Sequence, residues 1–321
     1  MPCVLYNKDY REVWDQTVRA SRNATFLFER DFMDYHQDRF TDASLLFFNE
    51  KGKCIALLPA NIKKENHEIQ SHGGLTYGGL LLTKEVHTPQ VQEMLIEAAN
   101  IYEEMGATTW SYKPIPYIYH RYPTQEDLYW LFRMKATLAA RAVSTVIDLQ
   151  DPLPFSTLRK RKVKKAQNSG FTITEGGDQH WKDYWQILTD VLQQQHDTRP
   201  VHTLQEIQLL ANRFPKQIRL FTILEGNTCL AGCVVFDMDP TVHIQYIAAN
   251  PEGKEKGALD LLFHQLIEQA TRQGRHYFDF GISTEEGGQI LNEGLLFQKE
   301  GFGGRAVCYD NYIIPLKSLA R

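Results

Sequence analysis

One arrangement of strands and a helix occurs twice in this sequence, and the duplication limits the fold more than any single residue does. Two segments, SLLFFNEKGKCIALLPANIK from Ser44 and IRLFTILEGNTCLAGCVVFDM from Ile218, each place two apolar runs around a turn and predict a β-hairpin. Each hairpin is followed by a short strand, a Gly-bearing loop, a long amphipathic helix, a glycine (Gly106 or Gly274) and an aromatic strand. The sequence therefore predicts two copies of one unit with a cleft between them, where small molecules preferentially bind.

The order of these elements also predicts the fold class. Hairpins precede each helix instead of alternating βα units, which indicates an α/β protein of the α+β type with mixed, largely antiparallel sheets flanked by helices. The chain has 321 residues, more than one hydrophobic core usually supports, which is roughly 250 to 300 residues. The Pro-rich step Asp151–Pro154 marks the expected boundary, giving domains 1–150 and 151–321.

Composition excludes several classes of function. The net charge of −4 gives no global attraction to nucleic acid or to anionic membranes. No apolar stretch is long enough to span a bilayer and no secretory signal opens the sequence, so we expect a cytoplasmic protein without membrane insertion. The five cysteines are scattered, as is typical of reduced thiols, and the spacing of Cys229 and Cys233 does not fit a zinc site. No metal is expected.

One loop offers a seat for phosphate. NPEGKEKGA (Asn250 to Ala258) carries the chain from a strand through two glycines into a long helix, where unpaired amides and the helix dipole attract anions. Lys254, Lys256 and Gly257 would contribute to such a seat. An ordinary turn with solvated lysines is the alternative, because a single Gly-rich loop is a weak signal.

Three other segments are candidate binding regions. RKRKVKK (Arg159 to Lys165) is the most basic run, and a solvated helix face fits it better than a nucleic-acid surface because no aromatic residues are interleaved. The segment HDTRPVHT brings together polar groups that suit an anion or a sugar, although each histidine alone is typical of a surface or capping position: His196, Arg199 and His202. The loop HGGLTYGG, with Tyr77 and Gly78, allows close approach of a ligand or forms two tight turns.

The second half resembles a known family. The run QYIAANPEGKEKGALDLLFHQLIEQATRQGRHYFDFGIST, followed by GLLFQKEGFGGR, is similar to the GNAT-fold acyltransferases of the FemABX and BioF2-like acetyltransferase group. In that group a tyrosine strand, a helix, a D-[FL]-G strand end and a [FY]-K-x-x-[FY]-G segment follow in this order. Here Gln298 replaces the aromatic residue before the lysine, and GKEKGA only partly matches the acyl-CoA signature. Because Fem-type proteins are tandem GNAT domains, the resemblance extends to the first half through the duplication.

The resemblance implies an N-acyltransferase whose second domain binds acyl-CoA, with acetyl-CoA the first candidate, and whose acceptor is an amine on a small molecule, amino sugar or peptide. Amine attack on an acyl carbonyl needs oxyanion stabilisation and proton transfer. Lys299 would stabilise the oxyanion, Tyr246 would protonate the leaving group, and Asp279 would orient or deprotonate the acceptor. The donor would lie along Ile247, Ala248 and Ala258. Two alternatives remain: a Fem-type transferase that uses aminoacyl-tRNA on peptidoglycan peptides, and a non-catalytic ligand-binding GNAT pair.

Overall fold

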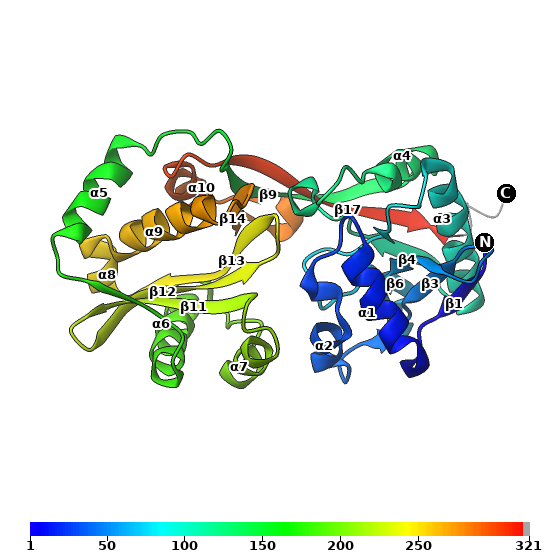
Figure 1. Ribbon diagram of the computed structural model, residues 1–321, viewed down its shortest axis with the longest axis horizontal. Coiled ribbons are helices and arrows are strands. Elements are labelled where there is room, and N and C mark those ends of the chain that lie inside the picture. Colours follow the sequence, from blue (N-terminus) through cyan, green and yellow to red (C-terminus); the bar gives the residue numbers. More distant parts are fainter. Residues whose placement is uncertain (317–321) are drawn as a thin grey trace. The chain divides into compact units, whose positions relative to one another are not determined.

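The computed structural model describes residues 1–316, except for the side chains of residues 195 and 196, and divides into two units (Figure 1). Unit 1 contains residues 1–143, 284–290 and 308–316. Unit 2 contains residues 144–283 and 291–307. The long strands β9 (Thr137–Asp148) and β17 (Arg305–Pro315) each contribute residues to both units.

Unit 1 contains two groups of hydrogen-bonded strands. Its first sheet has the order β1-β3-β4-β7, and its second group has the order β17-β8-β6-β5-β2. These strands are β1 (Cys3–Leu5), β2 (Thr41–Asp42), β3 (Leu45–Phe48), β4 (Cys54–Leu58), β5 (Asn61–Lys63), β6 (Glu68–Gln70), β7 (Leu81–Leu82) and β8 (Thr109–Tyr112). The helices are α1 (Arg11–Ala20), α2 (Arg30–Met33), α3 (Thr88–Glu104) and α4 (Glu126–Arg133), and the short strand β15 (Thr284–Glu285) completes the unit.

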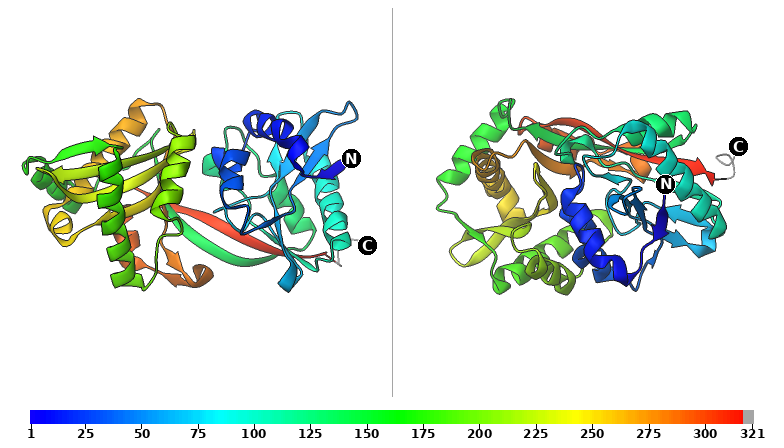
Figure 2. Two further views of the ribbon diagram at one scale, coloured as in Figure 1. Left: turned by 90° about the horizontal axis from the view of Figure 1, so that it is seen from below. Right: turned by 45° about the vertical axis from the view of Figure 1, so that its right-hand side comes forward.

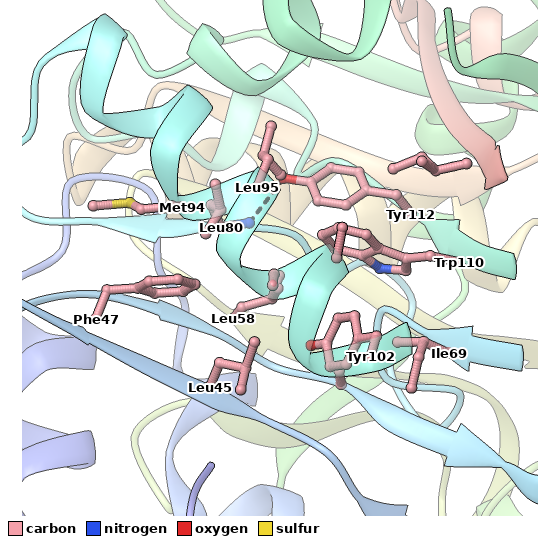
Figure 3. Close-up of a cluster of buried hydrophobic side chains, with 14 of the residues drawn as sticks. Leu45, Phe47, Leu58, Ile69, Leu80, Met94, Leu95, Tyr102, Trp110 and Tyr112 are labelled. Atoms are coloured by element: carbon pink, nitrogen blue, oxygen red, sulfur yellow. Dashed lines mark hydrogen bonds between the residues drawn. The ribbon is translucent and has the colours of Figure 1, made fainter. Parts of the chain in front are cut away.

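The core of unit 1 gathers apolar residues from both groups of strands around α3 (Figure 3). Trp110 and Tyr112 of β8 are fully buried there. The Tyr112 hydroxyl accepts a hydrogen bond from Leu80 N at 2.9 Å and donates one to Asp127 at 2.8 Å. The one polar atom of this ring is therefore satisfied inside the core, as burial requires.

Unit 2 is built on one continuous run of strands, in the order β10-β11-β12-β13-β14-β9. Neighbouring strands are antiparallel except for β13 and β14. The strands are β10 (Thr172–Glu175), β11 (Ile218–Glu225), β12 (Thr228–Asp237), β13 (Thr241–Ala249) and β14 (Tyr277–Ile282). The short β16 (Ile290–Leu291) pairs with β15 and has one residue in each unit. The helices are α5 (Thr157–Gln167), α6 (Asp178–His196), α7 (Leu204–Arg213), α8 (Pro251–Lys256), α9 (Ala258–Arg272) and α10 (Glu293–Glu300).

Helices cover both faces of the unit 2 sheet. Helix α9 lies along one face of the sheet (Figure 1). Its apolar residues belong to one core together with Phe278 and Phe280 of β14. Helix α6 lies across the strands on the other face (Figure 2), where Tyr184 closely approaches Gly232 of β12. Side chains that alternate along each strand therefore point either into the α9 core or toward α6 and α7.

The fold class predicted from the sequence is confirmed, including both hairpins and the mixed, largely antiparallel sheets. Ser156 caps α5 by accepting a hydrogen bond from Arg159 N, and Thr203 and Glu206 form a capping box at the start of α7. Residues 26–40 form no continuous helix, because only α2 is α-helical there and short 3-10 turns flank it. Among the described residues, no helix combines the length and apolar character that crossing a bilayer requires.

Candidate active site

A β-bulge brings two polar side chains of β13 to the same face of the sheet. Val235 of β12 pairs with Ile244, and Val234 pairs with Tyr246, so Gln245 is an extra residue in the ladder. An extra residue shifts the alternation of side chains by one position. His243 and Tyr246, three residues apart, therefore both point away from the α9 core.

The bulge lies next to a point where β13 and β14 separate. The parallel pairing of these strands covers only Thr241 to His243, opposite Tyr277 to Asp279. Beyond His243, the edge of β13 that faces β14 has no ladder partner from that strand. Ile247 and Ala248, the predicted donor-binding residues, lie on this part of β13.

Asp279 is fully buried and has three hydrogen-bonding partners. Its Oδ1 accepts from Ser144 Oγ of β9 at 2.5 Å and from Gly281 N at 2.9 Å, and its Oδ2 lies 2.7 Å from His243 Nδ1. A carboxylate can only accept, so an ionised Asp279 would require the proton of the imidazole to be on Nδ1. The carboxylate is thus directed at the imidazole and the backbone, and its exposure is zero.

Lys299 of α10 approaches the same strand end from another side. Its Nζ donates to the carbonyls of Gly281 and Ile282, both at 2.8 Å, and the side chain is almost completely buried. Burial lowers the pKa of Lys299 to about 8, although the nearby charge of Asp279 opposes the shift. An ammonium has three N–H donors, so one is left for a further acceptor.

The three apolar residues before Lys299 are not buried together. Leu295 and Leu296 are half-buried, and Phe297 is 67% exposed. Lys299 is held in place by its two carbonyl acceptors and by the turn of α10 rather than by burial of Phe297.

Tyr246 and His202 form a hydrogen-bonded pair. The Tyr246 hydroxyl lies 2.6 Å from His202 Nδ1 and accepts a longer hydrogen bond from His202 N at 3.3 Å. Burial raises the pKa of Tyr246, while the hydrogen bond from the His202 backbone opposes that shift. The ring also packs edge-to-face on Trp185 of α6. His202, predicted as a substrate ligand, is buried beside Tyr246.

The segment predicted as a phosphate-binding loop is the short helix α8. Asn250 caps it by accepting from Gly253 N at 2.7 Å. Lys256 is paired with Glu225 and Glu252, whereas Lys254 is exposed. Gly257 has a φ of +76°, and a Cβ there would lie 3.2 Å from the Lys162 carbonyl of α5. This glycine therefore joins α8 to α9 where α5 packs closely, and Ala258 behind it is fully buried.

The remaining predicted binding residues are spread over both units. Arg199 is exposed between α6 and α7, and the side chain of His196 lies outside the described part of the chain. In unit 1, Tyr77 is 2% exposed and contacts the rings of Phe28 and Tyr119. A Cβ at Gly78 would lie 2.8 Å from the Ser71 carbonyl oxygen, so close backbone packing accounts for that glycine.

Two residues at the strand junction were missed by sequence reasoning. His243 lies three residues before the tyrosine on which the reasoning concentrated, and Ser144 comes from a strand of the preceding segment. Regular strand alternation would place His243 and Tyr246 on opposite faces. The sequence does contain the order H-x-x-Y followed by D-F-G. This order shows that the residues lie close together only when the bulge and the parallel register are also known.

Comparison with known proteins identifies the domain that contains this site. Residues 157–286, which contain most of unit 2, match the model of the acetyltransferase (GNAT) domain. Unit 2 therefore contains a GNAT domain. No curated protein matches the sequence. The matched residues include His243, Tyr246 and Asp279, whereas Lys299 lies beyond them.

Solved structures extend the likeness to the whole chain. FemX has a TM-score of 0.69 at 10% identity, with 97% of each chain covered. The C-terminal domain of a putative lysylphosphatidylglycerol synthetase from Agrobacterium fabrum has a TM-score of 0.58 at 14% identity, covering 96% of this chain and 92% of that one. A tandem GNAT protein from the clavulanic acid biosynthesis pathway has a TM-score of 0.51 at 10% identity, with 98% of each chain covered. These similarities show a FemX-like, tandem-GNAT fold.

Proposed function

We propose that the protein is an N-acyltransferase that moves an acyl group from acyl-CoA, with acetyl-CoA the first candidate, to an amine on a small molecule, amino sugar or peptide. The observation that carries this proposal is the group of polar side chains at the point where β13 and β14 of the GNAT domain separate. A donor bound there would place its carbonyl next to Lys299 and Tyr246.

The unpaired edge of β13 suits the arm of a CoA donor. Amide groups of an extended ligand can hydrogen-bond to a free strand edge in the way that an added strand does. Ile247 and Ala248 would provide this edge. Lys254 is exposed, so it can meet the donor phosphates directly, whereas Lys256 would first have to leave its carboxylate partners.

Lys299 and Tyr246 would serve the two charge changes of the reaction. When the amine attacks the carbonyl carbon, negative charge develops on the carbonyl oxygen, and the remaining N–H of Lys299 can stabilise it. As the bond to sulfur breaks, the Tyr246 hydroxyl can give its proton to the departing thiolate. Arg199 is exposed and available to bind an anionic acceptor.

A second donor is supported by one specific observation. Helix α5 presents an exposed basic face, which includes Lys160, Arg161 and Lys164. Such a face can contact nucleic-acid phosphates. An aminoacyl-tRNA, as in Fem-type peptidoglycan transferases, is therefore the alternative donor, since its ester carbonyl would undergo the same attack.

Parallel assays with two kinds of acyl donor test the proposal. The protein would be incubated with acetyl-CoA and a panel of primary amines, and thiol release would be followed; the same amines would be tested with an aminoacyl-tRNA, following loss of the ester. We expect thiol release that depends on the amine. Transfer only from the aminoacyl-tRNA would establish the alternative donor, and no transfer from either donor would contradict acyltransferase activity.

A further inference from the structure

His243 lies at the end of the part of β13 that pairs with β14. It lies on the same face of β13 as Tyr246 because of the bulge at Gln245. Its side chain is 10% exposed, whereas the Asp279 carboxylate behind it is completely buried. A carboxyl without solvent access cannot receive a proton from an acceptor amine directly, but a partly exposed imidazole can.

The surroundings of His243 fix the orientation of its ring. Its Nδ1 lies 2.7 Å from Asp279 Oδ2, and Asp279 is itself held by Ser144 Oγ and Gly281 N. With the proton on Nδ1, the lone pair of the neutral ring is on Nε2. This is the arrangement in which a buried carboxylate orients an imidazole for proton abstraction.

Gly281 lies beside this imidazole. A Cβ at residue 281 would lie 3.5 Å from Cε1 of His243, and the φ of +76° favours glycine at this position. The amide of this glycine donates to Asp279. Lys299 holds the same short segment through the carbonyls of residues 281 and 282.

We propose that His243 is the general base of the acyl transfer and that Asp279 is its positioning residue. This inference rests on the acyltransferase function proposed above. As the amine nitrogen bonds to the carbonyl carbon, one of its protons passes to Nε2 of His243. The carbonyl electron pair moves to oxygen and returns when the bond to the leaving sulfur or oxygen breaks. The leaving group takes a proton from Tyr246, and exchange with solvent restores both side chains.

The substitution His243→Asn separates catalysis from structure. The asparagine amide can still donate to Asp279, but it cannot accept a proton from the amine. We expect kcat to fall by about 100-fold to 10,000-fold, the usual range for loss of general base catalysis. The KM for the donor should stay within about threefold. Gln70→Asn is the matched control, because Gln70 occupies the same register position in unit 1 and should leave kcat within about threefold.

A second variant guards against misfolding. Ser144→Ala removes one of the three partners of Asp279 and leaves the imidazole in place, so we expect a smaller loss in kcat, about threefold to tenfold. Because a buried acceptor loses its donor, the melting temperature should fall, but the protein should remain folded at the assay temperature. If His243→Asn turns over within threefold of the wild type, His243 is not the base, although the acyltransferase function would stand.

A spectroscopic measurement decides the inference without turnover. Nitrogen-15 NMR of labelled histidines, with His243 assigned through His243→Asn, should show a neutral ring protonated on Nδ1 in the wild type. Asp279→Asn should shift the proton to Nε2. A wild-type ring protonated on Nε2 would overturn the proposal even if no acyl donor is accepted. Absence of transfer with the expected tautomer would instead contradict the proposed function alone.

Discussion

The two units place different side chains at the same backbone position. In each unit, three residues of one strand pair in parallel with the strand that follows the helix-closing glycine: β6 with β8 in unit 1, and β13 with β14 in unit 2. The third pair in this register is Gln70 and Ser111 in unit 1 but His243 and Asp279 in unit 2. The duplicated backbone is shared, and the ionisable pair is present in one unit only.

The hydrogen-bond partners of Gln70 and Ser111 are consistent with this difference between the two units. Ser111 Oγ donates to Asn311 at 2.9 Å, and Gln70 donates to the carboxylate of Glu68 at 3.3 Å. Neither contact couples a titratable base to a buried acid. The difference between the units shows that the repeat preserves the backbone pairing. The ionisable side chains differ because other residue types occupy the paired positions in unit 2.

Buried lysines provide a closer comparison, because each unit contains one. Lys113 of unit 1 donates to Leu75 O at 2.7 Å and to His72 O at 3.4 Å, much as Lys299 of unit 2 donates to two carbonyls. Burial lowers the pKa of Lys113 to about 8, as it does for Lys299. The lysine of unit 1 is therefore a structural control for the lysine of unit 2.

The largest effect is expected from Lys299→Met compared with Lys113→Met. Both changes leave two carbonyls without a donor, so both should reduce the free energy of unfolding by a similar amount, about 1 to 3 kcal/mol. Only Lys299→Met should also lower kcat, by about 100-fold to 1000-fold, because it removes oxyanion stabilisation. Equal loss of kcat in the two variants would mean that Lys299 acts through the fold.

Tyr246→Phe and Tyr77→Phe make a second pair, in which each change removes one hydroxyl group. Loss of the proton donor to the leaving group should reduce kcat about 100-fold in Tyr246→Phe. Tyr77→Phe should stay within about twofold, because the ring packing on Phe28 and Tyr119 is kept. Steady-state rates with a thioester donor would measure both, and a large loss in Tyr77→Phe would give unit 1 a direct part in turnover.

The two lysines should also make stability depend on pH in the same direction. Each has a pKa of about 8 in the folded protein against an ordinary value of 10.5, so between these values the unfolded chain binds a proton that the folded chain lacks. The free energy of unfolding should therefore rise with pH across this window, by about 3 kcal/mol per lysine at most. Urea titrations at pH 8 and pH 10.5 would test this, and Lys113→Met should show a smaller rise than the wild type.

The smallest difference is expected at Gly106 and Gly274. Both end a long helix with positive φ, at +86° and +73°, and an added Cβ would meet nothing within 4 Å at either position. Gly106→Ala and Gly274→Ala should each destabilise the protein by about 1 to 2 kcal/mol, from backbone strain alone. Thermal unfolding that differs widely between these variants would show that the two units do not share this turn.

Much of the fold could be predicted because it depends on local patterns. Apolar runs around the Glu-Gly-Asn turn identified the hairpin of β11 and β12, and the T-x-x-E sequence identified the start of α7. The GNAT resemblance required only the order of short motifs in the second half. These signals come from residues that are close together in the chain, where local sequence patterns determine the secondary structure.

The site was less predictable because it depends on register between distant segments. Pairing of His243 with Asp279 needs the parallel alignment of β13 and β14, and its position beside Tyr246 needs the bulge at Gln245. The short helix α8 and its packing near Gly257 on α5 depend on a contact between segments that lie about 90 residues apart. Roles for Lys299, Tyr246 and Asp279 remain predictions that the experiments above address.

The strand β17 has a consequence for how the protein is made. Residues Tyr312 to Pro315 pair with β8, and Ile314 and Leu316 belong to the core of unit 1. Unit 1 begins at the start of the sequence, yet its sheet and core lack these residues until all of unit 2 has been synthesised. Truncation just before Cys308 should therefore damage unit 1, although most of its residues precede unit 2 in the sequence.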